Sequence, residues 1–527
     1  MKAPCDEAVI RSTASASRCA ENAQLWILAA TILGSSMAFI DSTVVNVALP
    51  AIQNSFHATV VDVQWVVESY GLFLGSLILL GGALGDMFGR RLLFLLGVGL
   101  FAAASLGCGI AMNIHFLNLA RSVQGVGAAL LVPGSLAIIG ASFDKKSRGK
   151  AIGTWSGFTA ITTAIGPVAG GWLVQHASWR WAFLVNLPLA AAVIVISLWK
   201  IPESRSTTKS RLDWWGTILC ALGLGGLVNG FVESANLGWR NPLVFGSIII
   251  GCVCLIAFAR VESRSSSPMV PLTLFKSRSF SGANLLTLFL YAAVGLFFFL
   301  FPLNLIQVHG YSPTATGAAV LPMILLMFSL SRWAGGLVAR YGPGVSLIVG
   351  PLIAASGFLL FALPSVGGRY WTTFFPAIIV LGFGMTITVA PLTTVVMSSA
   401  DEDHAGTASG INNAVARIAG VLAIAVLGIV MLQAFSVRLD HRLAELSLPA
   451  DVVHQIHADR IRLAGLQVSP NLEPSLQAAI KTSVGEAFVF GFRIVMLICA
   501  GLAAAGALVA RIMIVGDKKV ATDSAGN

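Results

Sequence analysis

The sequence predicts an all-α membrane protein built from two six-helix bundles and two inserted spans. The chain of 527 residues is 56% hydrophobic and only 11% charged, whereas soluble domains carry about 25% charged residues. Apolar runs long enough to cross a bilayer recur along it, about fourteen by the length rule. Helices follow because lipid leaves no backbone group without a partner, and the runs are too long and too uniformly apolar for barrel strands.

The first run, Leu25–Pro50, is too long for the core of a signal peptide, so we interpret it as a retained span. About 21 of the 33 basic residues fall on one side of the predicted spans and about 8 on the other. By the positive-inside rule, both termini are cytoplasmic, with tails at 1–24 and 515–527. The basic excess therefore directs insertion into the membrane, and we expect no nucleic-acid binding.

An internal repeat indicates two related halves. Gly82–Arg91 between spans 2 and 3 and Gly335–Pro343 between spans 10 and 11 share the pattern Gly-x-Leu-x-x-x-aromatic-Gly. Pro50, which we expect to end span 1, and Pro302 in span 9 are separated along the chain by nearly the same number of residues as these two motifs. Two parallel repeats with a site at their interface are a transporter architecture, in which one half rocks against the other. The predicted parts are a bundle at 25–200, inserted spans 7 and 8 at 201–280, and a bundle at 281–514.

Segment 434–485 is the one sizeable piece that we expect outside the membrane, on the external face. Its apolar residues recur at helical spacing, which predicts two or three short helices. His454 and His457, near Asp451 and Asp459, could form a metal site. A solvated helix face is the better interpretation of so short a motif, so no metal is predicted.

Two carboxylates stand inside predicted spans, Asp41 in span 1 and Glu68 in span 2. A charged side chain at the centre of a spanning helix costs about 3 kcal/mol on insertion scales, and protonation removes that cost. Both positions are therefore candidate proton carriers. The alternatives are a structural Asp41 held by hydrogen bonds from a neighbouring helix, and a Glu68 that pairs near the external interface.

Arg121 lies within span 4 and cannot shed its charge. In lipid it must face the bundle interior and have a partner. Counting about 1.5 Å per residue along the spans puts Asp41, Glu68 and Arg121 at similar depth. A guanidinium beside a carboxylate stabilises the ionised form, while burial opposes it, so proton release could depend on which face is open. A purely structural clamp is the alternative for Arg121.

The turn after span 2 places Asp86 just before Gly89-Arg90-Arg91. Gly89 permits a positive φ, and the two arginines can bind carboxylates or lipid phosphates. A phosphate-binding loop is excluded because no strand precedes these glycines.

Span 5 carries two pairs of residues that disturb a regular helix or let a neighbour come close. Pro167 removes a backbone donor, so Gly166-Pro167 predicts a kink. Gly170-Gly171 predicts close approach of a partner helix. Simple helix packing is the alternative and differs little in practice.

At this point the chain resembles the major facilitator superfamily, and within it the fourteen-span drug:proton antiporters of the EmrB/QacA type. Met87 stands where the superfamily's loop signature usually has arginine, and Thr162 replaces the first glycine of the antiporter signature. The segments that carry the resemblance are Phe39–Pro50 in span 1, Gly82–Arg91, Leu117–Ala129 in span 4, Thr162–Gly171 in span 5 and Trp179–Pro188.

The resemblance implies a latch between the halves at the Gly82–Arg91 loop, formed by Asp86, Gly89, Arg90 and Arg91. It also implies a wide cavity with apolar and aromatic walls. The second half has no intramembrane acid, and span 13 instead carries Asn412, Asn413 and Arg417, which argues against export of multivalent cations. The cavity candidates are Trp155, Phe158, Tyr291, Phe298, Asn304, Met323, Met385 and Asn412.

The predicted function is proton-coupled export of drugs or other small hydrophobic or amphipathic compounds across the cytoplasmic membrane. The alternative is a metabolite or nutrient transporter of the same fold. No His-Glu-x-x-His, Gly-x-Ser-x-Gly or ATP-binding Gly-x-x-x-x-Gly-Lys-Ser/Thr motif is present, so we expect neither an enzyme nor an ATP-driven pump, and no cofactor. The expected partners are the substrate, protons, the bilayer and, in a cell with an outer membrane, a periplasmic adaptor.

Overall fold

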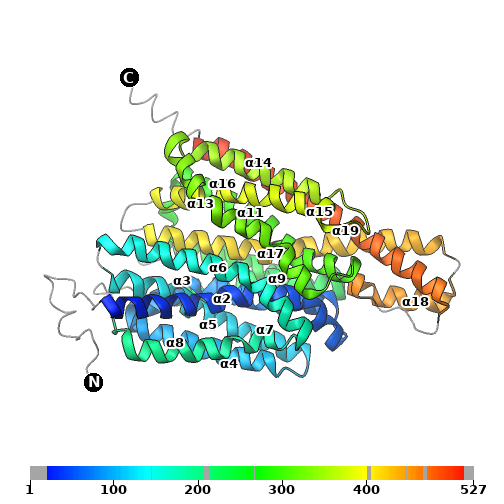
Figure 1. Cartoon of the computed structure of the whole chain (residues 1–527), viewed down its shortest axis with the longest axis horizontal. Coiled ribbons are helices and arrows are strands. Elements are labelled where there is room, and N and C mark those ends of the chain that lie inside the picture. Colours follow the sequence, from blue (N-terminus) through cyan, green and yellow to red (C-terminus); the bar gives the residue numbers. More distant parts are fainter. Residues whose placement is uncertain are drawn as a thin grey trace.

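The computed structural model describes residues 21–143, 145–205, 213–265, 268–399, 405–446, 448–466 and 472–515. These residues form helices and connecting loops, with no strand among them. Fourteen of the helices are long and apolar enough to cross a membrane, which confirms the predicted fold class and number of spans. Figure 1 shows these helices running side by side along the longest axis of the molecule.

The first half consists of helices that pack on one another through α3, α4 and α5 and through α2 with α6 and α8. One of its helices differs from what we expected, because α2 continues past Pro50, while Pro167 lies within α6. Its elements are α2 (Glu21–Phe56), α3 (Val60–Phe88), α4 (Arg90–Gly109), α5 (Ile114–Ser142), α6 (Lys145–His176), α7 (Trp181–Leu184) and α8 (Asn186–Lys200).

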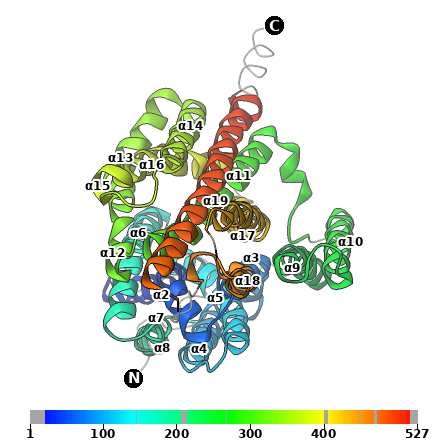
Figure 2. The ribbon, with the colours of Figure 1, turned by 90° about the vertical axis from the view of Figure 1, so that its right-hand side faces the viewer.

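Spans 7 and 8 form a helix pair beside the first half (Figure 2). They are α9 (Trp214–Leu237) and α10 (Pro242–Arg264). Asp213 caps α9 by accepting a hydrogen bond from the Gly216 amide at 2.8 Å. α9 packs on α3 and α17, while α10 packs mainly on α9, so α10 is the outermost span of the pair. The 3₁₀ helix η1 (Leu272–Lys276) leads to the second half.

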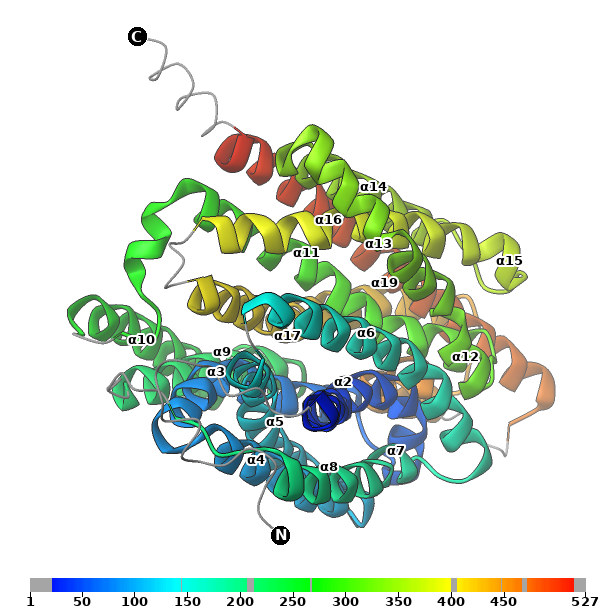
Figure 3. The same ribbon diagram turned by 60° about the vertical axis from the view of Figure 1, so that its left-hand side comes forward.

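The second half packs around α11, α16, α17 and α19, and Figure 3 shows it facing the first half across α6 and α17. Its elements are α11 (Arg278–Leu303), the π-helix η2 (Asn304–Val308), α12 (Pro313–Ala319), α13 (Leu321–Tyr341), α14 (Pro343–Phe361), α15 (Tyr370–Thr373), α16 (Phe375–Ser398), α17 (Ala405–Ala444), α18 (Ala450–Asp459), the 3₁₀ helix η4 (Arg460–Gly465), α19 (Pro474–Val509) and the π-helix η5 (Ala510–Val515).

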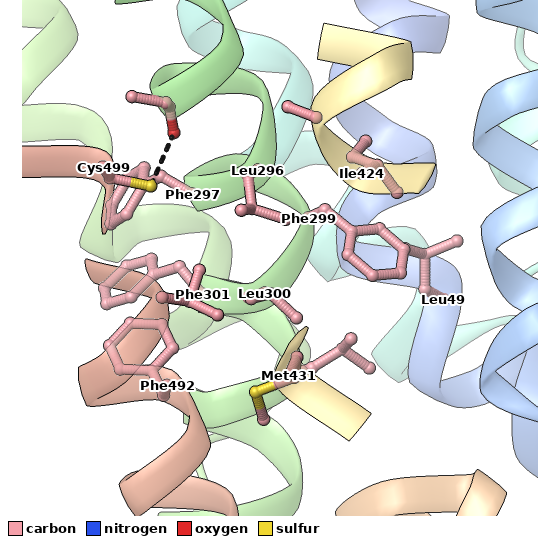
Figure 4. Close-up of a cluster of buried hydrophobic side chains, with 14 of the residues drawn as sticks. Leu49, Leu296, Phe297, Phe299, Leu300, Phe301, Ile424, Met431, Phe492 and Cys499 are labelled. Carbon is pink, nitrogen blue, oxygen red and sulfur yellow. Dashed lines mark hydrogen bonds between the residues drawn. The ribbon is translucent and has the colours of Figure 1, made fainter. Parts of the chain in front are cut away.

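An aromatic core holds the second half together around α11. Phe297 and Phe301 stack with their ring centroids 4.8 Å apart. Figure 4 shows them near Phe492 and Cys499 of α19, and shows Phe299 directed toward Leu49 of α2 in the other half. The core is thus continuous across the contact between the two halves, as the shared cluster of buried residues also shows.

The repeat seen in the sequence corresponds to the same local structure in both halves. Gly89 separates α3 from α4, and Gly342 separates α13 from α14. Both glycines have positive φ, 127° and 76°, a region that residues with a side chain rarely adopt. The matching turns explain why the glycine recurs at this offset.

Segment 434–485 is more helical than the sequence suggested. α17 continues to Ala444 and α19 begins at Pro474, and the residues described between them form the α-helix α18 and the 3₁₀ helix η4. The extension of α17 follows from its apolar residues, since Leu439 and Leu443 are both buried. Its packing therefore continues beyond the length that a bilayer requires.

η4 lies against both halves at one end of the molecule, which we call the Gln53 end. It packs on α2 and α3 of the first half and on α17, α19 and η2 of the second. Gln53 of α2 donates a hydrogen bond to the Arg462 carbonyl at 3.1 Å and accepts one from Gln307 of η2 at 2.8 Å. These bonds join the halves at this end, opposite the turn that contains Gly89.

Candidate functional site

Asp41 of α2 and Arg121 of α5 form an ion pair in the interior of the first half, through Asp41 Oδ2 and Arg121 Nη1. Their side chains are 0% and 1% exposed. Arg121 Nε also donates to the Val66 carbonyl of α3 at 2.9 Å. The guanidinium therefore links its own helix α5 to α2 and α3, and the structure brings together two of the three residues predicted to couple transport to protons.

The other oxygen of Asp41 is bound by two amides that the sequence analysis did not single out. Asp41 Oδ1 accepts from Gln124 Nε2 at 2.8 Å and from Asn186 Nδ2 at 3.3 Å. Ser105 of α4 accepts from the same two nitrogens at 2.8 and 3.4 Å. Gln124 could have been predicted from its spacing in the sequence, because it follows Arg121 by one helical turn and so lies on the same face of the helix.

Tyr70 of α3 completes the surroundings of the ion pair. Its ring centroid lies 4.3 Å from Arg121 Cζ, and its hydroxyl donates to the Ala38 carbonyl at 3.3 Å. An aromatic face next to a guanidinium adds attraction that does not depend on a second acid. Arg121 is thus surrounded by a carboxylate, a carbonyl, an amide and a ring.

Burying the intact ion pair costs much less free energy than burying either charge alone. Taking two charges out of water is offset by their mutual attraction only when the remaining donors and acceptors are satisfied, and here neutral amides and a carbonyl satisfy them. Removing one partner from such a pair leaves an uncompensated buried charge and costs about 3–5 kcal/mol. The arrangement can therefore respond to a proton, because protonation of Asp41 would cancel one of the two charges.

Glu68 lies apart from this network. It is fully buried, and neither carboxylate oxygen has a hydrogen-bond partner among the described residues. A buried polar group without a partner is costly, and much more so when it is ionised. Glu68 therefore differs from Asp41, whose two oxygens are both bound.

The helical spacing of α3 places Glu68 on the face that meets α17 of the other half. A side chain added at Gly71 would approach Val421 at 2.7 Å, and one added at Gly75 would approach Ile418 at 3.2 Å. Glu68 precedes these positions by about one and two turns. The second predicted proton carrier is thus on the surface along which the halves would move.

The predicted latch makes its contacts within the first half. Arg90 binds Asp86 one turn earlier, with Nη2 to Oδ1 at 2.8 Å. The carboxylate of Glu203, just after α8, accepts from the backbone amides of Arg91 and Leu92 at 3.0 Å each, which satisfies donors at the start of α4. Glu203 was missed because nothing in its sequence neighbourhood shows that α8 ends beside this turn.

The glycines of α6 lie close to neighbouring helices. A side chain at Gly170 would approach Val44 of α2 at 2.6 Å, and Gly166 faces Thr43 of the same helix. Gly171 faces the backbone of Pro313 at the start of α12, so this glycine lies between the halves. These contacts show which helices lie next to the glycines of the motif. A kink at Pro167 stays a prediction.

Gly317 of α12 offers a test of the contact between α6 and α12. A methyl group there would overlap the Pro167 carbonyl, so we expect Gly317→Ala to force the helices apart, lower the unfolding temperature and reduce transport. Overpacking of this kind lowers the free energy of unfolding by about 1–3 kcal/mol. Gly501→Ala in α19 is the matched control, since no atom lies within 4 Å of its added carbon. Equal thermal stability and transport in both variants would contradict the expectation.

The predicted cavity residues fall into three groups. Asn304, Met323 and Met385 are buried in the second half. Asn412 donates to Thr287 at 2.7 Å and to Asn284 at 3.2 Å, both on α11, and Trp155 donates to Ser35 of α2 at 3.1 Å. The remaining candidates, Phe158, Tyr291 and Phe298, are partly or largely exposed. A role in substrate binding stays a prediction for all eight.

Fourteen spanning helices, arranged as two halves and the α9–α10 pair, with a buried ion pair inside the first half, define the chain as a multi-pass membrane transporter. The family model described as Major Facilitator Superfamily matches residues 31–424. The chain therefore belongs to the major facilitator superfamily, as its motifs indicated.

Individual proteins that resemble this chain give a more specific comparison than the family model. The chain is 34% identical to a multidrug resistance protein, Stp, of Mycobacterium tuberculosis, over 90% of this chain and 89% of that protein. It is 31% identical to a tetracenomycin C resistance and export protein of Streptomyces glaucescens, over 92% and 90% of the two chains. In the solved structure of a bacterial homologue of the human lysosomal transporter Spinster, the fold is similar with a TM-score of 0.63 at 18% identity, covering 94% of this chain and 98% of that one.

Proposed function

We propose that this protein is a proton-coupled antiporter that exports drugs or other small hydrophobic or amphipathic compounds across the cytoplasmic membrane. The observation that carries the proposal is the fully buried Asp41–Arg121 ion pair, which also binds α3 through Val66. Relatives of nearly equal length are named as resistance and export proteins, which supports export rather than uptake of a nutrient.

Asp41 is the main proton carrier in this mechanism. In the present conformation Arg121, Gln124 and Asn186 all stabilise the ionised carboxylate by donating to it. A movement of α3 or α5 that draws Arg121 away removes the charged donor, and burial then favours the protonated acid. The proton is thus taken up in one conformation and released in the other.

Glu68 is the second carrier. Its position on the α3 face toward α17 means that rocking of the halves changes its surroundings, from a buried site without donors to one that water can reach. Burial without a donor favours the neutral acid, so exposure would favour ionisation. Asp41 responds to the position of Arg121, while Glu68 responds directly to the separation of the halves.

The test is transport of a compound panel by the purified protein in liposomes with an imposed pH gradient. Accumulation that depends on the gradient and stops when a protonophore is added would support the proposal. Transport that is indifferent to the gradient would contradict proton coupling. The alternative of a metabolite transporter would be favoured if accumulation were driven only by another ion. It would also be favoured if only nutrients were accumulated.

The proposed orientation places both termini and the Gly89 turn in the cytoplasm and the Gln53 end outside. Met112, 89% exposed between α4 and α5, should then be outside, and Arg205, exposed after α8, should be inside. We expect Met112→Cys, but not Arg205→Cys, to react with a membrane-impermeant maleimide in intact cells, relative to the wild-type chain. The reverse labelling pattern would overturn the orientation.

A further inference from the structure

Arg417 stands where the two halves meet. It projects from α17 of the second half, and its Cβ would lie 3.7 Å from a side chain added at Gly75 of α3. Its Cζ is 5.9 Å from the ring centroid of Phe39 of α2. Its charge is also close enough to Tyr70 of α3 and Tyr291 of α11 to interact with both hydroxyl groups. Four helices, two from each half, therefore surround this guanidinium.

Arg417 has no acidic partner and no hydrogen-bond acceptor among the described residues, although a guanidinium carries five N–H donors. Three other arginines in or next to the spans do use their donors. Arg121 donates to Asp41 and to a carbonyl, and Arg493 of α19 donates to the Leu363 and Pro364 carbonyls at 3.2 and 2.9 Å. Arg180 donates to the Ala111 carbonyl at 2.9 Å. Arg417 is therefore not a clamp on helix backbones.

Part of the Arg417 side chain is accessible. The residue is partly buried, and Asn413, one turn earlier on the same helix face, is exposed. Polar and charged groups within spans face the bundle interior or a water-filled cavity rather than lipid. An arginine that keeps its charge here and lacks a protein acceptor is suited to an acceptor that arrives with a ligand.

Resting on the proposed export function, we propose that Arg417 is the specificity-determining residue that binds an anionic oxygen, a carboxylate or phenolate, of an aromatic substrate. Phe39, Tyr70 and Tyr291 supply aromatic surface beside the guanidinium, so one ligand can stack on a ring and pair with the charge. The lack of acids in the predicted membrane interior of the second half agrees with this, because an acid there would neutralise Arg417 or favour cations instead.

The position of Tyr70 connects this binding site with the ion pair. Its ring contacts Arg121, and its hydroxyl is within electrostatic reach of Arg417 and of Asp41. A bound anion would therefore lie one side chain away from the residues that carry the proton. Substrate selection and proton coupling would then use neighbouring arginines with separate tasks.

The test measures binding of three matched probes to the purified protein in detergent: 2-naphthoate, 2-naphthamide and the ammonium form of 2-naphthylmethylamine. A hydrogen-bonded charge pair contributes about 1.5–3 kcal/mol, so we expect wild type to bind the carboxylate at least about tenfold more tightly than the amide. Arg417→Gln should reduce that ratio to about one. Arg417→Lys should keep part of it, and Arg417→Glu should favour the ammonium probe.

Arg438→Gln is the matched control, because Arg438 lies on the same helix but next to Phe490 of α19, away from the four-helix site. It should keep the preference for the carboxylate. A wild-type protein that binds the carboxylate no better than the amide, including no measurable binding of either, overturns the proposal, and so does an unchanged ratio in Arg417→Gln.

Because these measurements use no proton gradient, their outcome is independent of coupling. Proton-driven transport by a wild type without acid preference would refute only the role of Arg417. A clear acid preference in a protein that transports nothing would support the binding site and count against the proposed export function.

Discussion

Arg121→Ala is expected to abolish proton-driven accumulation. The substitution removes the only charged donor to Asp41 among the described residues and the hydrogen bond to Val66 of α3. It also leaves Asp41 buried without a counter-charge, which costs about 3–5 kcal/mol when one partner of such a pair is lost. Gradient-driven uptake into liposomes and the unfolding temperature should therefore both fall.

The double variant Asp41→Asn/Arg121→Ala separates coupling from folding. Removing both charges leaves no unpaired ion, so stability should recover relative to Arg121→Ala. Transport driven by protons should stay lost, because neither the proton carrier nor its partner remains. If Asp41 and Arg121 were both only structural, the double variant would regain transport together with stability.

Arg121→Lys provides a further control. Lysine keeps the charge but lacks the planar fork that lets Arg121 donate through Nε to Val66 and through Nη1 to Asp41 and Gln124. We expect a well-folded protein with strongly reduced coupling. Full activity of the lysine variant would show that charge alone suffices.

The two charged residues at the centre of the site could be predicted from the sequence alone. Asp41 and Arg121 are conspicuous in apolar spans, and counting residues placed them at one depth, where the structure pairs them. The amides of Gln124 and Asn186 could not be found in the same way, because a neutral amide costs little in a span and matches no hydrophobic period. Their role depends on how α5 and α8 are rotated toward α2, which only tertiary packing determines.

Helix ends were predicted less well than helices. Pro50 was expected to end its span, yet α2 continues to Phe56, because a membrane helix can keep its backbone order around a proline when neighbouring groups satisfy the freed carbonyls. Contacts between distant segments, such as Glu203 at the Gly89 turn or η4 at Gln53, had no signal at all. They depend on the relative positions of helices, which one sequence does not reveal.

Asp41→Asn should give a protein that binds uncharged substrate and exchanges it, but no longer accumulates it against a proton gradient. Asparagine imitates the protonated acid: its amide oxygen can still accept from Arg121, but the residue cannot lose a proton. Substrate that favours the ionised form of Asp41 must release a proton when it binds, because linkage between two ligands is reciprocal. The asparagine variant therefore removes the linkage and leaves the binding surface in place.

The deciding measurement is proton release in weakly buffered detergent solution when an uncharged transported compound is added, compared between wild type and Asp41→Asn. Wild type should release protons and the variant should not, while exchange of labelled for unlabelled compound continues in liposomes. Glu68→Gln should retain part of the release, since Glu68 is the second carrier and has no bond to Arg121. Equal release from wild type and Asp41→Asn would remove Asp41 from the mechanism and make Glu68, on the face where α3 meets α17, the group that carries the proton.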